Sequence, residues 1–207
     1  MFALTPGRRR RARLLAEVKR VAREDLDAVA EEVRALEAAA ENTGGEAHDA
    51  YYRAVALHGE AVAALAVARS VAGMRAVAER SAAARHQIAC ARALLEGAAA
   101  PDANPPCFFD PAHGPSEGPV AFAPEGGAMR QVPACDACAE EVRAGRVPDL
   151  RRVILDGRPQ PYWRSPVHGG YFLPGATYVD GVEIGIAGAL AIGAEDALVD
   201  WIADWFT

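Results

Sequence analysis

The 207-residue sequence predicts a mostly α protein with a small α+β part, in which a long antiparallel helical hairpin or coiled coil comes first. Two observations support this fold class. Alanine, which has the highest helix propensity, crowds residues 1–100, where apolar residues also recur with helical spacing. Aromatic residues, prolines and glycines crowd residues 101–207 instead. The change of composition at 98–106 therefore marks the boundary between the helical part and the rest.

The same features divide the chain into four predicted segments. Residues 1–100 form the antiparallel hairpin of two or three helices, and residues 101–106 form a Pro-rich linker. Residues 107–150 form a compact knuckle–hairpin–helix module. Residues 151–207 form an extension rich in aromatic residues and glycine, which ends in a short amphipathic helix.

The first helix is predicted to begin at Thr5-Pro6, because threonine caps helices and proline suits the first helical position. It continues to Asn42, and Thr43-Gly44-Gly45 then ends the helix and turns the chain. Apolar residues recur every three or four positions along it, which predicts one buried stripe. This stripe consists of Leu15, Val18, Ala22, Leu26, Val29, Val33 and Leu36.

A second helix is predicted at 46–69 and a third after Ser70, which can cap it. Whether the two form one bent rod stays open, although Gly73 favours a kink. Short turns between long helices predict antiparallel neighbours. The expected buried stripe of the second helix is Tyr51, Val55, His58, Val62 and Leu65, and that of the third is Met74, Val77, Ser81, Ala84, Ile88, Ala91 and Leu95. We expect Cys90 to be a small buried apolar residue.

Four side chains in the middle of the chain are of the types that bind metal ions. Cys107 and His113 lie in a loop that ends at Gly114, and Cys135 and Cys138 form a Cys-x2-Cys motif at the start of a predicted helix. Two cysteines at this spacing lie on one side of the first helical turn, where the helix dipole favours thiolates. Four such ligands suit a structural zinc ion. The sequence therefore predicts one Zn2+ held by these four residues.

Two alternatives stay open at this site. Asp110 is a rival of His113 for the fourth ligand, although imidazole is the more usual donor in structural zinc sites. The cysteines can also be reduced, metal-free and packed in a core. A short hairpin expected between Val120 and Val132, with its turn at Gly126-Gly127, would bring the two pairs of ligands together.

The segment from Cys107 to Gly145 resembles the treble-clef family of zinc modules, which implies the same four ligands. It departs from the family in the first pair, where five residues intervene and two are usual. The whole chain also resembles uncharacterised actinobacterial proteins that combine an Ala-rich helical region, a proline linker, a Cys-Phe-Phe-Asp-Pro-x-His-Gly stretch and a later Cys-x2-Cys. This second resemblance implies the segment boundaries and no activity.

Charge divides the chain in the same way as composition. Residues 1–100 contain 15 basic and 13 acidic side chains, whereas residues 101–207 contain 7 and 15. An acidic second half is a poor ligand for nucleic-acid phosphates. The sequence has no visible secretory signal and no apolar run long enough to cross a bilayer, so we expect a cytoplasmic protein without a transmembrane segment. The basic run Arg8–Arg13 is either a solvated terminus or a contact for an anionic surface.

The predicted function is that of a non-catalytic scaffold. If protein side chains fill all four zinc positions, none remains for a reacting water, so we expect no enzymatic activity. The last helix would present large apolar anchors for a protein partner or for self-association, namely Leu198, Trp201, Ile202 and Trp205. The alternative is a nucleic-acid-binding zinc module that uses the Arg-rich N-terminus and the arginines around the module. Neither the partner nor the oligomeric state can be read from the sequence.

Overall fold

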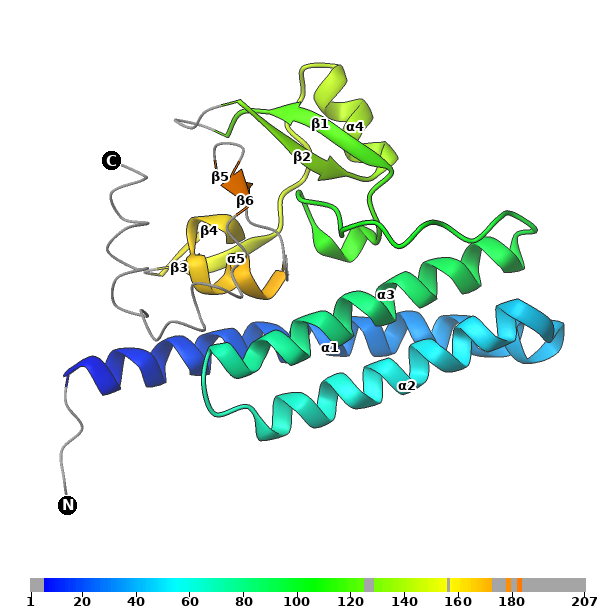
Figure 1. Ribbon diagram of the computed structural model, residues 1–207, viewed down its shortest axis with the longest axis horizontal. Coiled ribbons are helices and arrows are strands. Elements are labelled where there is room, and N and C mark those ends of the chain that lie inside the picture. The colour runs from blue at the N-terminus through cyan, green and yellow to red at the C-terminus, as the bar shows by residue number, and fades with distance from the viewer. Residues whose placement is uncertain (1–5, 125–128, 156, 173–177, 180–181, 184–207) are drawn as a thin grey trace. The chain divides into compact units, whose positions relative to one another are not determined.

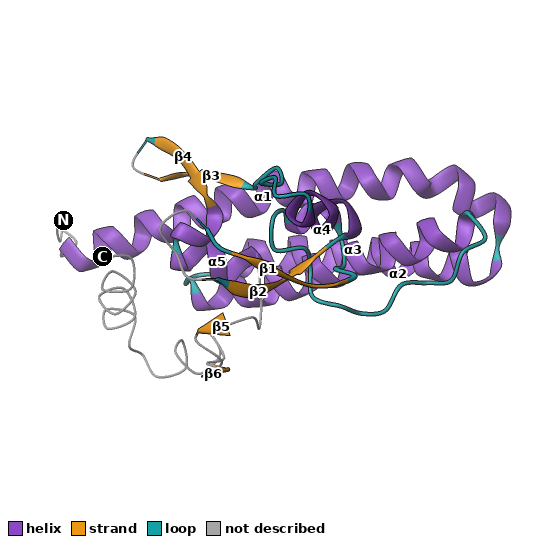
Figure 2. Cartoon of the chain, turned by 90° about the horizontal axis from the view of Figure 1, so that it is seen from above, coloured by secondary structure: helices purple, strands orange, loops and turns teal. Residues whose placement is uncertain are grey.

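The computed structural model describes residues 6–124, 129–155, 157–172, 178–179 and 182–183. It is mostly helical with small two-stranded antiparallel sheets, which confirms the coarse fold class (Figures 1 and 2). The chain divides into two compact units, Met1–Asn104 and Pro105–Thr207, and the division falls within the predicted linker. The helix predicted around Leu198–Trp205 lies outside the described residues.

The first unit, hereafter the helical unit, consists of three long helices that pack against one another: α1 (Pro6–Thr43), α2 (Gly45–Val67) and α3 (Arg75–Leu95). They lie side by side in Figure 1. The chain reverses between α1 and α2 at Gly44 and Gly45, whose φ angles of 69° and 65° lie in the region that glycine adopts without strain. The predicted turn at this position is therefore confirmed.

The helices α2 and α3 are separate and do not form one bent rod. Ala68, with φ −58° and ψ 125°, ends α2 in an extended conformation. The Ser70 hydroxyl then accepts a hydrogen bond of 3.1 Å from the backbone N–H of Gly73, and a short 3-10 helix, η1 (Ala72–Met74), leads into α3. Ser70 thus caps the turn that precedes the third helix.

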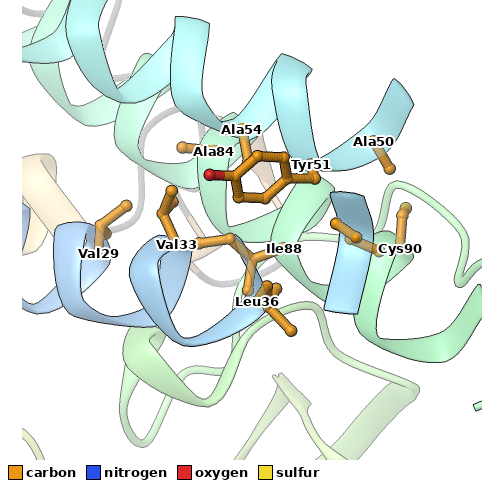
Figure 3. Packing of buried hydrophobic residues seen from close by; sticks show 11 residues of the cluster. Val29, Val33, Leu36, Ala50, Tyr51, Ala54, Ala84, Ile88 and Cys90 are labelled. Carbon is orange, nitrogen blue, oxygen red and sulfur yellow. The ribbon is translucent and has the colours of Figure 1, made fainter. Parts of the chain in front are cut away.

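The buried stripes predicted for the first and third helices face the core of the helical unit. Figure 3 shows Val29, Val33 and Leu36 of α1 opposite Ala84 and Ile88 of α3. Leu15 and Leu95, at the ends of the two stripes, are only partly buried. The other predicted members are all buried, namely Val18, Ala22, Leu26, Val29, Val33 and Leu36, and Met74, Val77, Ser81, Ala84, Ile88 and Ala91.

The stripe predicted for the second helix is partly wrong. Tyr51 and Leu65 are buried, but Val55 and Val62 are 38% and 46% exposed. Alanines fill the face that meets α1 and α3 instead, because a helix with small side chains can approach its neighbours closely. The buried residues of α2 are Ala47, Ala50, Tyr51, Ala54, Ala61 and Leu65. Periodicity alone could not find this face, because α2 is apolar on both sides.

A buried ion pair joins α1 to α3. Asp25 and Arg85 are only 3% and 6% exposed, and two guanidinium nitrogens of Arg85 lie 2.8 and 3.1 Å from the two carboxylate oxygens of Asp25. The hydroxyl of Ser81 donates to the same carboxylate at 2.9 Å. Such two-pronged pairing has strict geometry, so it determines which turn of α1 lies beside which turn of α3.

The second unit consists of short elements. The strands β1 and β2 form the hairpin predicted in this region, with Val120 opposite Val132. A second hairpin, β3–β4, follows the helix α4, and Figure 2 shows both hairpins in orange. The bounds are η2 Pro111–His113, β1 Gly118–Phe122, β2 Arg130–Ala134, α4 Asp136–Arg143, β3 Arg152–Leu155, β4 Arg158–Pro161, η3 Tyr162–Arg164, α5 Pro166–Phe172, β5 Tyr178–Val179 and β6 Val182–Glu183.

Candidate metal centre

Four ligand atoms converge in the second unit. The sulfur atoms of Cys107, Cys135 and Cys138 and one ring nitrogen of His113 all lie within 4.8 Å of one another. His113 Nδ1 is 3.3 Å from the Cys138 sulfur and 3.7 Å from the Cys135 sulfur. A tetrahedral zinc ion with its usual bond lengths separates a sulfur from a nitrogen ligand by about 3.6 Å. The cluster can therefore hold a metal ion, and its arrangement is zinc-like.

The first pair of ligands is positioned by a closed loop. The backbone N–H of Cys107 donates to the carbonyl of Gly114 at 3.0 Å, and Gly114 has φ 88°. Between them the chain makes the short 3-10 helix η2, in which the His113 N–H donates to the Asp110 carbonyl at 3.0 Å. This turn takes up the five residues between Cys107 and His113. The unusual spacing therefore still returns the imidazole to the side of the cysteine.

The rival ligand, Asp110, has a different place in the loop. Its carboxylate accepts a hydrogen bond of 2.9 Å from the backbone N–H of Ala112 and so caps η2. Within the described part of the chain, the group of close ligand atoms includes His113 and does not include Asp110. Asp110 supports the loop that presents the histidine.

The second pair lies where β2 passes into α4. Cys135 is the residue before the helix, its carbonyl accepts from the Ala139 N–H at 2.9 Å, and Cys138 lies in the first turn. Two backbone hydrogen bonds attach the first loop to β2, from the N–H of Phe108 to the Pro133 carbonyl and from the N–H of Glu117 to the Ala134 carbonyl. The strand β2 thus connects to both pairs of candidate ligands and fixes their positions relative to each other.

The surroundings of the cysteines favour the protonated thiols unless a cation is bound beside them. Burial raises the pKa of the Cys107 thiol, although hydrogen bonds from the backbone of Cys135, Asp110 and Phe109 lower it in part. Burial, and then the neighbouring Cys107 and Cys135, raise the pKa of the Cys138 thiol well above its ordinary value. Several thiolates cannot share this site without a compensating charge, which a divalent cation would supply.

The two inner ligands and the two outer ligands differ in exposure. Cys107 and Cys138 are buried beside Phe109 and Val120, whereas Cys135 is half-buried and His113 is exposed. A bound ion would therefore be shielded on the side of the protein core and accessible on the side of the imidazole.

The loop of Cys107 has a support that the sequence did not predict. The hydroxyl of Tyr162 donates to the Phe108 carbonyl at 2.8 Å, and the backbone N–H of Arg151 donates to the Phe109 carbonyl at 2.8 Å. Tyr162 is fully buried, and the ring of Trp163 stacks on Phe108 with centroids 4.6 Å apart. Tyr162 and Trp163, which the sequence placed in a separate extension after residue 150, therefore help to complete the core around the candidate metal centre.

Other predicted residues lie apart from this cluster or outside the described chain. Cys90 is buried in the helical unit, as expected, and its sulfur lies 3.5 Å from His86 Nε2. The candidate partner-binding residues Leu198, Trp201, Ile202 and Trp205 fall in the range 184–207, which is not described. In the described part of the chain, no helix combines the length and the apolar character that crossing a membrane requires.

A scan against protein-family models, a search of the curated proteins and a search of the solved structures each found no match to the chain. The resemblance to treble-clef modules and to the actinobacterial group gains no support from them. The candidate metal centre accordingly rests on its own geometry.

Proposed function

We propose that the four converging side chains bind one structural Zn2+ and that the protein is a non-catalytic scaffold. The observation that carries the zinc assignment is the approach of three sulfur atoms and His113 Nδ1 to within 4.8 Å of one another. Three thiolates and one imidazole form a common structural zinc set, and softer ligands favour zinc over magnesium or calcium. With all four positions filled by protein, the ion stabilises the fold and leaves no position for a reacting water.

Metal analysis of the purified full-length protein tests the zinc proposal. We expect one zinc per chain, which is lost in Cys107→Ser and Cys135→Ser. Cys90→Ser is the matched control, because Cys90 is buried in the other unit and should leave the zinc content unchanged. The protein is first reconstituted with added zinc under reducing conditions. If it then contains no stoichiometric metal, the proposal is refuted.

The identity of the fourth ligand is tested by a second pair of variants. Asp110→Asn keeps a side-chain oxygen that can accept from the Ala112 N–H, so it should retain zinc. His113→Ala should lose zinc, and His113→Cys should retain it, because a fourth thiolate also suits a tetrahedral site. Zinc loss in Asp110→Asn together with retention in His113→Ala would assign the ligand to Asp110.

The scaffold proposal also concerns the C-terminal apolar residues Leu198, Trp201, Ile202 and Trp205. Their helical spacing and two tryptophans suit the binding of a protein surface. This role is tested with a double variant that carries both Trp201→Ala and Trp205→Ala. The proteins that it captures are compared with those captured by the unchanged full chain. If both capture the same proteins with equal yield, the C-terminal residues are not the binding surface.

A nucleic-acid-binding role is the second candidate, and one observation favours it. Arg8, Arg9, Arg11 and Arg13 are all exposed at the start of α1. Two of the arginines near the metal centre are otherwise engaged, since Arg146 pairs with Glu141 at 2.6 Å and Arg151 lies over the Phe172 ring. The test is retention on heparin at two salt concentrations, for the unchanged chain and for a variant in which the five arginines at 8–11 and 13 become glutamine. Retention that falls steeply with salt and is lost in the variant would promote this function over the scaffold.

A further inference from the structure

The helix α2 carries a second apolar face on the side opposite its buried alanines. We call it the outer face of α2, and all eight of its residues are exposed. They recur with helical spacing over about four and a half turns, which at 1.5 Å per residue is about 24 Å of helix. The face consists of Tyr52, Val55, Ala56, Gly59, Val62, Ala63, Ala66 and Val67.

The outer face is unusual because it contains no charged residue. From residue 50 to residue 67, the only charged side chains of α2 are Arg53 and Glu60. Both lie at the border with α3, where Arg53 donates to Gln87 at 2.9 Å and Glu60 accepts from Arg80 at 3.2 Å. A helix that is apolar all round is normally buried all round, and contiguous exposed apolar surface marks a site of interaction.

We propose that the outer face of α2 binds the same face of a second copy of this chain, with the two helices antiparallel. This rests on the proposed scaffold function and names its partner. The charges at the two ends of α2 support antiparallel self-pairing. Glu46 and Asp49 lie at its beginning and Arg69 just beyond its end, and all three are exposed. An antiparallel copy places each acidic end beside the partner's arginine, whereas a parallel copy places like charges together.

The sizes of the side chains support the same arrangement. Gly59 lies at the middle of the outer face, and a Cβ added there would meet no other atom within 4 Å. Small residues on both sides of it, Ala56 and Ala63, leave room for a second helix to approach closely. Val55 and Val62 flank them and would pack beside that helix. A face with its smallest residue at the centre is suited to an isologous contact, in which each copy uses the same surface.

The oligomeric state of the full-length, zinc-loaded protein tests the proposal. Sedimentation equilibrium over a range of concentrations should give a mass approaching twice the 21.8 kDa of the chain. A single helix pair is a small interface, so the dissociation constant should be on the order of micromolar. Val55→Glu with Val62→Glu should weaken the dimer at least tenfold. Val147→Glu is the matched control, because that valine is also exposed, at 67%, but lies in the other unit.

A charge exchange tests the antiparallel direction. Arg69→Glu should weaken the dimer by about three- to tenfold, and adding Glu46→Lys and Asp49→Lys should restore it. In a parallel pair, Arg69 would lie beside Arg69, so the single change would not weaken association. Rescue by the exchange therefore supports the antiparallel pairing, and its absence overturns it.

Two further outcomes would overturn the proposal. A monomer at all concentrations would mean that the outer face does not pair with a second copy. A dimer that survives Val55→Glu with Val62→Glu would use another surface. Zinc content and the capture of proteins by the C-terminal residues, measured on the same samples, separate this failure from that of the proposed function: a monomer that binds one zinc per chain and still captures a protein through Trp201 and Trp205 refutes only the self-pairing.

Discussion

The two units of this protein are stabilised in different ways. The helical unit relies on many small apolar contacts spread along three helices, together with one buried ion pair between Asp25 and Arg85. The second unit combines a small apolar core with a few directional contacts, namely the convergence of four candidate ligands and the hydrogen bonds to the backbone of Phe108 and Phe109. Distributed apolar packing weakens by degrees when it is perturbed. A site of four ligands fails when one is removed, so the two units should respond very differently to single changes.

Removing the metal should produce the largest difference between the units. A chelator, or Cys107→Ser, should unfold the second unit, because binding of a structural zinc contributes about 10–16 kcal/mol of apparent free energy. The helical unit should keep most of the far-ultraviolet helical signal. With Trp201→Phe and Trp205→Phe as background, the emission of Trp163 reports on its stacking against Phe108. Unchanged Trp163 emission after complete metal removal would contradict the proposed stabilising role.

Breaking the buried ion pair should produce the largest effect of a single change on the helical unit. Asp25→Ala removes the carboxylate that faces the buried Arg85, which should cost about 3–5 kcal/mol of the free energy of unfolding. The measurement is chemical denaturation followed by circular dichroism, and zinc content should not change. Glu24→Ala is the control, since the exposed Arg20–Glu24 pair should contribute less than about 0.5 kcal/mol. Equal losses in the two variants would show that burial of the pair has no energetic consequence.

The pH dependence of metal binding is a second property expected of the second unit and not of the helical unit. Because burial holds the pKa of the Cys107 and Cys138 thiols above the ordinary range, both bear protons at neutral pH and release them to a metal. Zinc affinity should therefore rise with pH, by at least about a hundredfold per unit because at least two protons are displaced, and fall as the solution is acidified. Competition with a chelator of known affinity at several pH values measures this slope. A slope near zero would mean that the thiols are already ionised.

The smallest predicted effect separates the two faces of α2. Ala54 faces the core and is buried, so Ala54→Leu should overpack it and cost about 1–3 kcal/mol. Val55 is exposed in the single chain, so Val55→Leu should change the free energy of unfolding of the monomer by less than about 0.5 kcal/mol. Thermal unfolding at dilute concentration measures both. Equal destabilisation by the two changes would mean that the outer face is packed within the chain.

The sequence predicted the metal module better than it predicted α2. Cysteine and histidine have few other reasons to recur in a tight loop and at a helix start, so residue type and order identified the four residues whose ligand atoms converge. Valine and alanine carry no such information. Val55 and Val62 fit the helical period as well as Ala54 and Ala61 do, and only packing against α1 and α3 decides which set is buried.

Contacts distant in sequence were the other part that could not be predicted. Nothing in the spacing of Tyr162 indicates that its hydroxyl binds the carbonyl of Phe108, 54 residues earlier. The same is true of the Asp25–Arg85 pair, since many acidic and basic residues alternate along the helices and only the fold selects these two. Both contacts follow from how whole elements pack, which a local pattern does not encode.

The clamp from Arg151 and Tyr162 onto the Phe108–Phe109 backbone has a consequence for biosynthesis. A ribosome completes the set of four candidate ligands when it adds Cys138, but the loop bearing Cys107 lacks its later hydrogen-bond donors until Tyr162 has been added. The nascent chain therefore passes through a stage in which all four side chains are present while the loop bearing Cys107 is held by fewer hydrogen bonds than in the finished protein.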